Sequence, residues 1–131
     1  MKTSGEIATG IYKYVKEHLG GLISGKVING KDRIETGKED IVIKVLANNL
    51  AQLQESYVNV NIYVPDVLRK EVYVRRDERV IQLECAAMDL FEKPFRVDGA
   101  RVVIENQTTL ASNNGREHVI NNKLLYQIIN E

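Results

Sequence analysis

Residues 20–27 read GGLISGKV and match a phosphate-binding loop up to its last position. Such a loop needs serine or threonine after the lysine to hold magnesium, with a strand before the loop and a helix after it. Here Val27 follows Lys26, and the flanking pattern is helical before the segment and strand-like after it. No helix N-terminus would then face a bound phosphate. The segment therefore predicts a helix stop followed by a turn, not a nucleotide site.

The two histidines and the single cysteine do not form a recognisable chemical site. Neither His18 nor His118 has a cysteine or carboxylate at zinc-ligand spacing. We expect His18 to end the first helix, where a positive charge is favourable, and His118 to lie near the start of the last strand. Cys85 falls among apolar helix positions, so we expect it to pack as a small hydrophobic side chain.

Two pairs of adjacent carboxylates stand at the expected starts of elements. Side chains of neighbouring strand residues point to opposite faces, so Glu39 and Asp40 are not expected to share a metal ion or a proton. Asp77 is expected to cap a helix, with Glu78 beside it. We predict no enzyme, no catalytic residues, no cofactor and no bound metal. A small metal-dependent nuclease or hydrolase, with carboxylates converging from distant positions, is a less favoured alternative.

Residues 69–79 mix basic and acidic side chains in the order RKEVYVRRDER. One interpretation is a solvated surface at the start of a helix. The other is a subunit interface, where alternating charges set the register between partners. On the second interpretation the candidate contact residues are Arg69, Lys70, Arg75, Arg76 and Arg79.

Residues 108–116 contain Ser112-Asn113-Asn114-Gly115, which is typical of a flexible polar hairpin tip. A polar loop that contains glycine can become ordered against a binding partner. The candidate partner-contact residues are Thr108, Asn113, Asn114 and Arg116.

Two predicted helices frame these segments. Thr3 and Glu6 have the spacing of a capping box, and apolar residues recur at helical spacing behind them, which predicts a helix over 4–19. Gly20 and Gly21 are expected to end it in the left-handed conformation. A second helix is predicted over 77–93, before Pro94.

Residues 57–64 alternate polar and apolar side chains, as in a strand with one buried and one wet face. Similar patterns predict further strands over 22–28, 40–46, 101–107 and 117–129. The segments 31–39 and 47–56 are expected to be polar connections, and 72–74 a short extra strand or a docked flap. The order helix, three strands, helix, two strands predicts one α+β domain over 1–131, with a mainly antiparallel sheet and both helices packed on one face.

The overall composition limits the classes of partner. The 18 Lys and Arg residues balance 18 Asp and Glu residues, which disfavours generic nucleic-acid binding. No apolar run approaches the roughly 20 residues that span a bilayer, and the first residues lack a signal-peptide core. A lone cysteine is typical of a reducing compartment. We therefore expect a cytoplasmic chain without a membrane or a specific nucleic acid as partner.

The order of elements at this chain length resembles that of phage tail terminator and tail-completion (head–tail joining) proteins. The resemblance is carried by the segments 7–19, 38–43, 57–62, 79–90 and 117–129. It implies a phage or prophage virion structural protein that self-associates into a ring, usually a hexamer, and meets the tail-tube and head-connector proteins. It supplies no catalytic residues, and the insertion at 66–76 departs from the shortest members. The alternative is a non-enzymatic soluble α+β protein-binding module.

Overall fold

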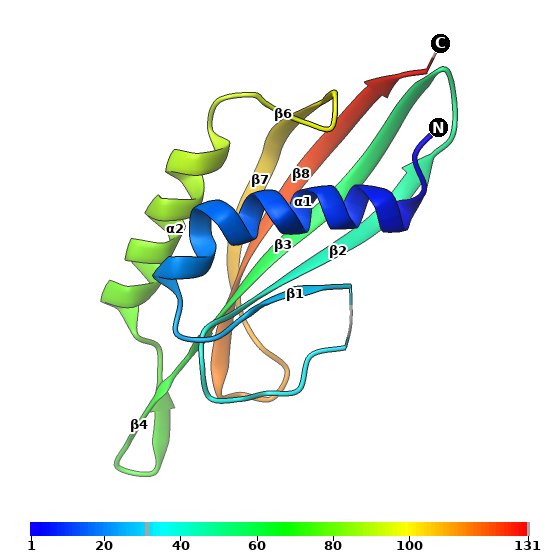
Figure 1. Ribbon diagram of the computed structural model, residues 1–131. Coiled ribbons are helices and arrows are strands. Elements are labelled where there is room, and N and C mark those ends of the chain that lie inside the picture. The colour runs from blue at the N-terminus through cyan, green and yellow to red at the C-terminus, as the bar shows by residue number, and fades with distance from the viewer. Residues whose placement is uncertain (31, 131) are drawn as a thin grey trace.

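A twisted sheet of six strands dominates the computed structural model, which describes residues 1–30 and 32–130 (Figure 1). The strand order is β1-β2-β3-β8-β7-β6. Only β1 runs parallel to its neighbour, and all other adjacent pairs are antiparallel. The strands are β1 (Val27–Asn29), β2 (Asp40–Asn49), β3 (Leu53–Pro65), β6 (Phe95–Val97), β7 (Ala100–Ala111) and β8 (Glu117–Ile129).

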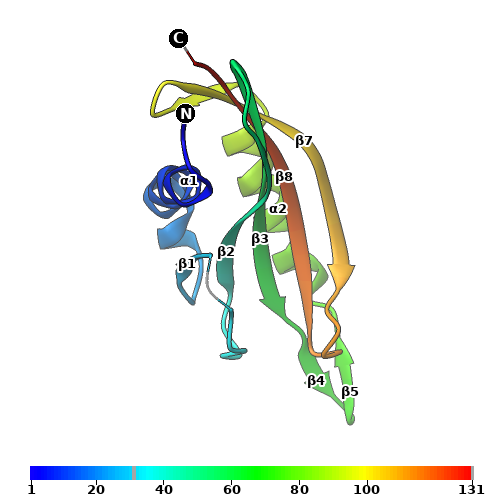
Figure 2. The ribbon, with the colours of Figure 1, turned by 90° about the vertical axis from the view of Figure 1, so that its right-hand side faces the viewer.

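Two helices, α1 (Ser4–Leu19) and α2 (Asp77–Phe91), lie on the same face of this sheet. Their buried apolar side chains join those of the facing strand residues in one core, to which Ile11, Val60, Leu83 and Leu124 belong. The opposite face carries no helix among the described residues (Figure 2). The predicted α+β architecture is confirmed.

Helix α1 has the predicted bounds because its capping box forms. The Thr3 hydroxyl accepts the Glu6 backbone N–H, and the Glu6 carboxylate accepts the Thr3 backbone N–H. The prediction of a left-handed Gly20 was wrong. Its φ is −59° and its N–H donates to Lys16 O, so the chain continues into a short 3₁₀ turn, η1 (Gly20–Leu22).

The strand predicted over 22–28 is present only as β1, one residue beyond the predicted end. The residues before β1 are not part of a strand. Individual hydrogen bonds to the start of β2 hold them in place. Gly25 N–H donates to Glu39 O at 2.7 Å, and Lys26 N–H donates to the Asp40 carboxylate at 2.9 Å.

The polar connection predicted over 47–56 is mostly strand, because β2 and β3 extend into it. Its polar side chains satisfy one another beneath the N-terminus of α1. Gln54 donates to Asn48 and to Lys2 O, both at 2.7 Å, and the Ser56 hydroxyl donates to Asn48 at 2.6 Å. Polar residues can occupy a buried strand end when each finds a partner.

Strand β8 lies in the middle of the sheet, between β3 and β7, so its backbone is paired on both sides. Strand β7 is longer than predicted and is followed by a tight turn at residues 112–116. Thr108 therefore belongs to β7, opposite Asn121, and not to the hairpin tip as predicted. Strand β6 was not predicted, although Asp98-Gly99, both at positive φ, is a typical two-residue hairpin turn.

Helix α2 begins with Asp77 as its first residue, so the prediction of Asp77 as N-cap was wrong. Arg76 takes the N-cap position without a side-chain bond. Cys85 was expected to be packed but is exposed. The buried stripe of α2 consists of Val80, Leu83, Ala87 and Phe91. At 100° per residue this turns Cys85 toward solvent.

A hairpin of two short strands, β4 (Val67–Arg69) and β5 (Val72–Val74), leaves the body between β3 and α2 (Figures 1 and 2). We call residues 67–74 the arm. The predicted strand at 72–74 is thus present, but it projects and is not docked as a flap. The segment 31–39 was expected to be an exposed polar connection, and residues 32 and 34–38 are exposed. Residue 31 lies outside the described residues, whereas Arg33 and Glu39 are largely buried.

Candidate interaction surface

The arm carries apolar side chains that the body does not cover. Leu68 is 58% exposed and Val72 is 61% exposed. Leu68 pairs with Tyr73, and Val67 with Val74, so both faces of the hairpin carry apolar groups. An isolated two-stranded hairpin is at best marginally stable in water. A second molecule that covers these side chains would stabilise the arm.

The turn of the arm is built from residues that do not favour it. Lys70 has φ 47° and Glu71 has φ 68°, so both central residues of this two-residue turn are left-handed. Asparagine and glycine normally occupy such a turn. The conformation costs roughly 1–2 kcal/mol for each side-chain-bearing residue. Long charged side chains are therefore displayed at the tip at the expense of local stability.

At the junction of the arm with α2, two arginines have carboxylate partners. Arg79 donates to both Glu39 oxygens at 2.6 and 2.8 Å and also to Leu22 O. The hydrogen bond from Arg79 lowers the pKa of Glu39, against the opposing effect of burial. Arg75 pairs with Asp77 at 2.6 Å, but this pair is exposed and screened by solvent. Arg79, a predicted interface residue, thus fastens α2 to the start of β2.

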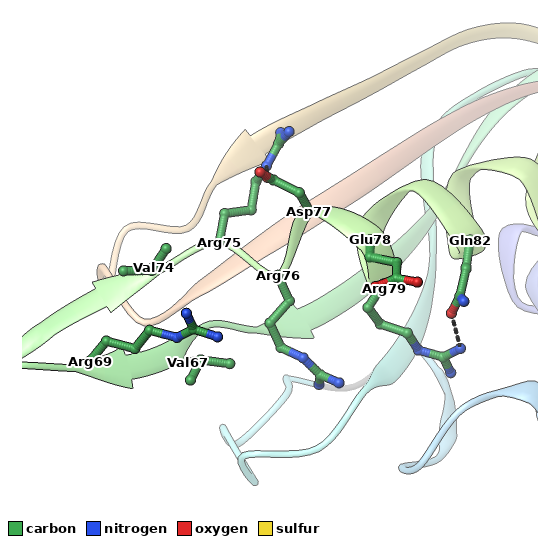
Figure 3. Close-up of a pocket in the computed structure, with 9 residues that line it drawn as sticks. All are labelled: Val67, Arg69, Val74, Arg75, Arg76, Asp77, Glu78, Arg79 and Gln82. Carbon is green, nitrogen blue, oxygen red and sulfur yellow. Dashed lines mark hydrogen bonds and ion pairs between the residues drawn. The ribbon is translucent and has the colours of Figure 1, made fainter.

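The remaining basic groups of this region are unpaired. Among the described residues, neither Arg69, Lys70 nor Arg76 has a hydrogen bond or ion pair through its side chain, and all three are exposed. In Figure 3 the Arg69 and Arg76 side chains lie on one side of the junction, and Arg75 points to the other side with Asp77. Three of the five predicted interface residues, Arg69, Lys70 and Arg76, are therefore exposed and unpaired among the described residues, whereas Arg75 and Arg79 have carboxylate partners.

The predicted partner-contact residues are divided by the structure. Asn113 and Arg116 are exposed on the turn after β7, and Thr108 lies within the sheet. Asn114 donates to Glu35 at 3.0 Å and to Glu117 at 3.2 Å, so its amide serves the loop beside it. The candidate contact on this turn reduces to Asn113 and Arg116.

This turn also holds the root of the arm. Asp66 N–H donates to Arg116 O at 2.8 Å, and the Asp66 carboxylate lies 2.8 Å from Nδ1 of His118. The arm therefore projects from a fixed base at the β7–β8 end of the sheet. His118 has a structural role, and His18 bonds Tyr14 O at the end of α1 as its position predicted.

Arg33 links distant parts of the chain, and the sequence alone did not reveal this role. Its guanidinium binds both Glu117 oxygens at 2.6 and 2.9 Å and Asp40 at 3.0 Å, and it lies 4.0 Å from the centre of the Tyr63 ring. Only 7% of the side chain is exposed. It fastens the segment before β2 to the open sheet face. Nothing in a polar, glycine-containing segment distinguishes this arginine from a solvated one.

The adjacent carboxylates of Glu39 and Asp40 do not come together. Glu39 binds Arg79, whereas Asp40 binds Arg33 on the other side of the strand. Across residues 1–30 and 32–130, no three His, Cys, Asp or Glu side chains are arranged to hold a metal ion. Over the same residues, the helices are too short or too polar to cross a bilayer.

Comparison with models of known protein families and with curated proteins finds no match to this chain.

Proposed function

We propose that the chain is a phage or prophage structural protein of the head–tail junction, a tail terminator or related neck component, that self-associates into a ring. The observation that carries this proposal is the arm, with its exposed apolar side chains and unpaired basic groups. The order of elements supports the tail terminator class through its resemblance to that family. Assembly would take place in the host cytoplasm, and the finished ring would belong to the virion.

The arm is not covered by the other described residues. It makes its own strand pair, and its apolar side chains remain in water. A projecting hairpin of this kind is stabilised by burial against another surface, at about 25 cal/mol per Å² of apolar area. A second copy of the chain supplies that surface at the same concentration as the arm itself.

Ring formation requires a contact between two different patches. An arm that binds elsewhere on a neighbour leaves that neighbour's arm free for the next copy, and the series closes if the rotation permits. The turn with Asn113 and Arg116 would provide the axial contact to the tail tube, because it is exposed and lies beside the root of the arm.

The test measures two properties of the protein: its assembly into an oligomer and its binding to the ends of tail tubes. Native mass spectrometry and sedimentation are expected to show a closed oligomer, at high concentration or after a tube end is supplied. Electron microscopy of polymerised tail tubes mixed with the protein is expected to show capped ends. Bare tube ends at saturating protein would contradict the terminator role.

A matched pair of charge-reversal variants tests whether capping of tube ends depends on the basic residues beside the arm. Charge reversal at Arg75 and Arg76 to glutamate is expected to abolish capping. Reversal of two exposed lysines on α1, Lys13 and Lys16, changes the net charge equally and is expected to leave capping intact. Equal loss in both variants would indicate a general charge effect, without a role for the arm.

The rival function, a protein-binding module, would use the same arm for an unrelated partner. A chain that remains monomeric at every concentration, and leaves tube ends bare, would favour that rival.

A further inference from the structure

We propose that the arm of one copy docks on the outward stripe of α2 in the next copy. We call this surface the α2 stripe; it consists of the exposed residues Glu78, Ile81, Gln82, Cys85, Asp89 and Glu92. The inference rests on the proposed self-association and specifies its interface.

The α2 stripe is acidic and partly apolar. It contains three carboxylates and no lysine or arginine, and none of those carboxylates has an ion pair among the described residues. In the middle of the stripe Ile81 is 54% exposed, next to Cys85 one turn further along. An apolar centre with charged ends is the usual anatomy of a protein interface.

The arm and the residues that follow it have the complementary character. Arg69, Lys70, Arg75 and Arg76 are basic, and Glu71 is the one acidic residue between them. Leu68, Val72, Tyr73 and Val74 provide exposed apolar side chains to meet Ile81. Opposite charge at the rims directs two such surfaces together and sets their register.

The open face of the sheet is the competing surface, and its charge disfavours it. Lys44, Lys123 and Arg101 lie on that face, and among the described residues with a cross-strand partner there, Glu55 is the acidic group that is not bound to Arg33. A basic arm would be repelled there. The acidic α2 stripe is the better match.

Within its own chain the arm borders only the first turns of the α2 stripe, where Val67, Arg69 and Val74 line one hollow with Glu78 and Gln82 (Figure 3). It leaves the body at the N-terminal end of α2 and extends away from that helix (Figure 1). A contact of the tip of the arm with the further part of the stripe, at Cys85, Asp89 and Glu92, must therefore form between copies. Because the two surfaces differ, it is heterologous and continues from copy to copy.

Cysteine trapping tests this geometry directly, since Cys85 is native, exposed and the one cysteine of the chain. In Tyr73→Cys, mild oxidation is expected to link residue 73 of one copy to Cys85 of the next. Non-reducing electrophoresis should then show a ladder of trimers and larger species. Tyr73→Cys combined with Cys85→Ser should lose every species above the dimer.

A control cysteine measures random collision. Leu50→Cys places an exposed thiol in the turn between β2 and β3, at the end of β3 that is remote from the arm, in a chain that keeps the native Cys85. It is expected to give no ladder. A ladder of equal intensity in Leu50→Cys and Tyr73→Cys would overturn the proposed contact.

Charge exchange provides a second readout. We expect Asp89→Lys with Glu92→Lys, and separately Arg75→Glu with Arg76→Glu, each to weaken self-association at least about tenfold. Combining all four changes should restore most of the wild-type affinity. An oligomer that persists unchanged in both double variants would overturn this interface and leave the proposed function intact. A wild-type chain without oligomer, ladder or capped tubes would overturn both.

Discussion

Arg33 joins parts of the chain that are far apart in the sequence. It bridges Asp40 of β2 and Glu117 of β8 while it is almost fully buried. Burying a charge is costly unless it is paired and hydrogen-bonded, and here the guanidinium has both kinds of partner. Removing one member of such a group leaves the others buried without compensation.

We therefore expect Arg33→Ala to lower the free energy of unfolding by about 3–5 kcal/mol, measured by urea denaturation. Arg101→Ala is the matched control, because Arg101 is exposed and its bond to Gln127 is long, at 3.4 Å. Its effect should stay within about 0.5 kcal/mol. Equal effects of the two substitutions would show that the Arg33 network does not stabilise the fold.

Glu39 and Arg79 make stability dependent on pH. The hydrogen bond from Arg79 lowers the pKa of Glu39 in the folded chain below its usual 4.5. A carboxyl with a depressed folded pKa contributes stability above its unfolded pKa and loses it as pH falls through the folded value. The difference in unfolding free energy between wild type and Glu39→Gln should be full near neutral pH and shrink in acid below the usual pKa. A difference that grows on acidification would contradict this assignment.

At the scale of the elements, Gly25 allows the residues just before β1 to pass close to the start of β2. A Cβ at this position would overlap the Asp40 carboxylate and the Glu39 carbonyl. We expect Gly25→Ala to destabilise the fold by roughly 1–3 kcal/mol, the usual range for overpacking. Gly21→Ala is the control, since a Cβ there meets open space. If both substitutions lower the midpoint of thermal unfolding by the same amount, the steric explanation is refuted.

The turn of the arm offers a second test at this scale. Replacing Lys70 and Glu71 by Asn and Gly should relieve the left-handed strain and stabilise the hairpin by about 1 kcal/mol or more. Backbone amide exchange in residues 67–74 is expected to slow, while exchange in β3 and β8 stays the same. Unchanged exchange in the arm would mean that the turn residues do not limit its stability.

At the scale of the molecule, the arm and the body should be separable. Among the described residues, the strands of the arm pair with each other and with no other strand, so little of the core depends on the arm. Replacing residues 67–74 by a short Gly-Ser linker is expected to leave the thermal midpoint within a few degrees, because stability follows buried area. Self-association measured by sedimentation should be lost. A folded variant that still forms the oligomer would exclude the arm from the interface.

Local signals in the sequence determined much of this architecture. The Thr3–Glu6 capping box, the alternation of β3 and the long apolar pattern of β8 each depend on residues a few positions apart. Such signals predicted both helices, the main strands and the class of fold. They also predicted that the mixed-charge segment 69–79 leads into the second helix, as a solvated surface or as a subunit interface.

Only the tertiary structure decided where polar residues are buried and what each charge meets. Gln54, Ser56 and Asn48 form strand ends because they bond one another and Lys2 O, which no local pattern expresses. Arg33 and Arg79 resemble surface arginines until folding places carboxylates beside them. The partners of such groups come from distant parts of the chain, and their energies depend on burial, which exists only after the sheet and helices have packed.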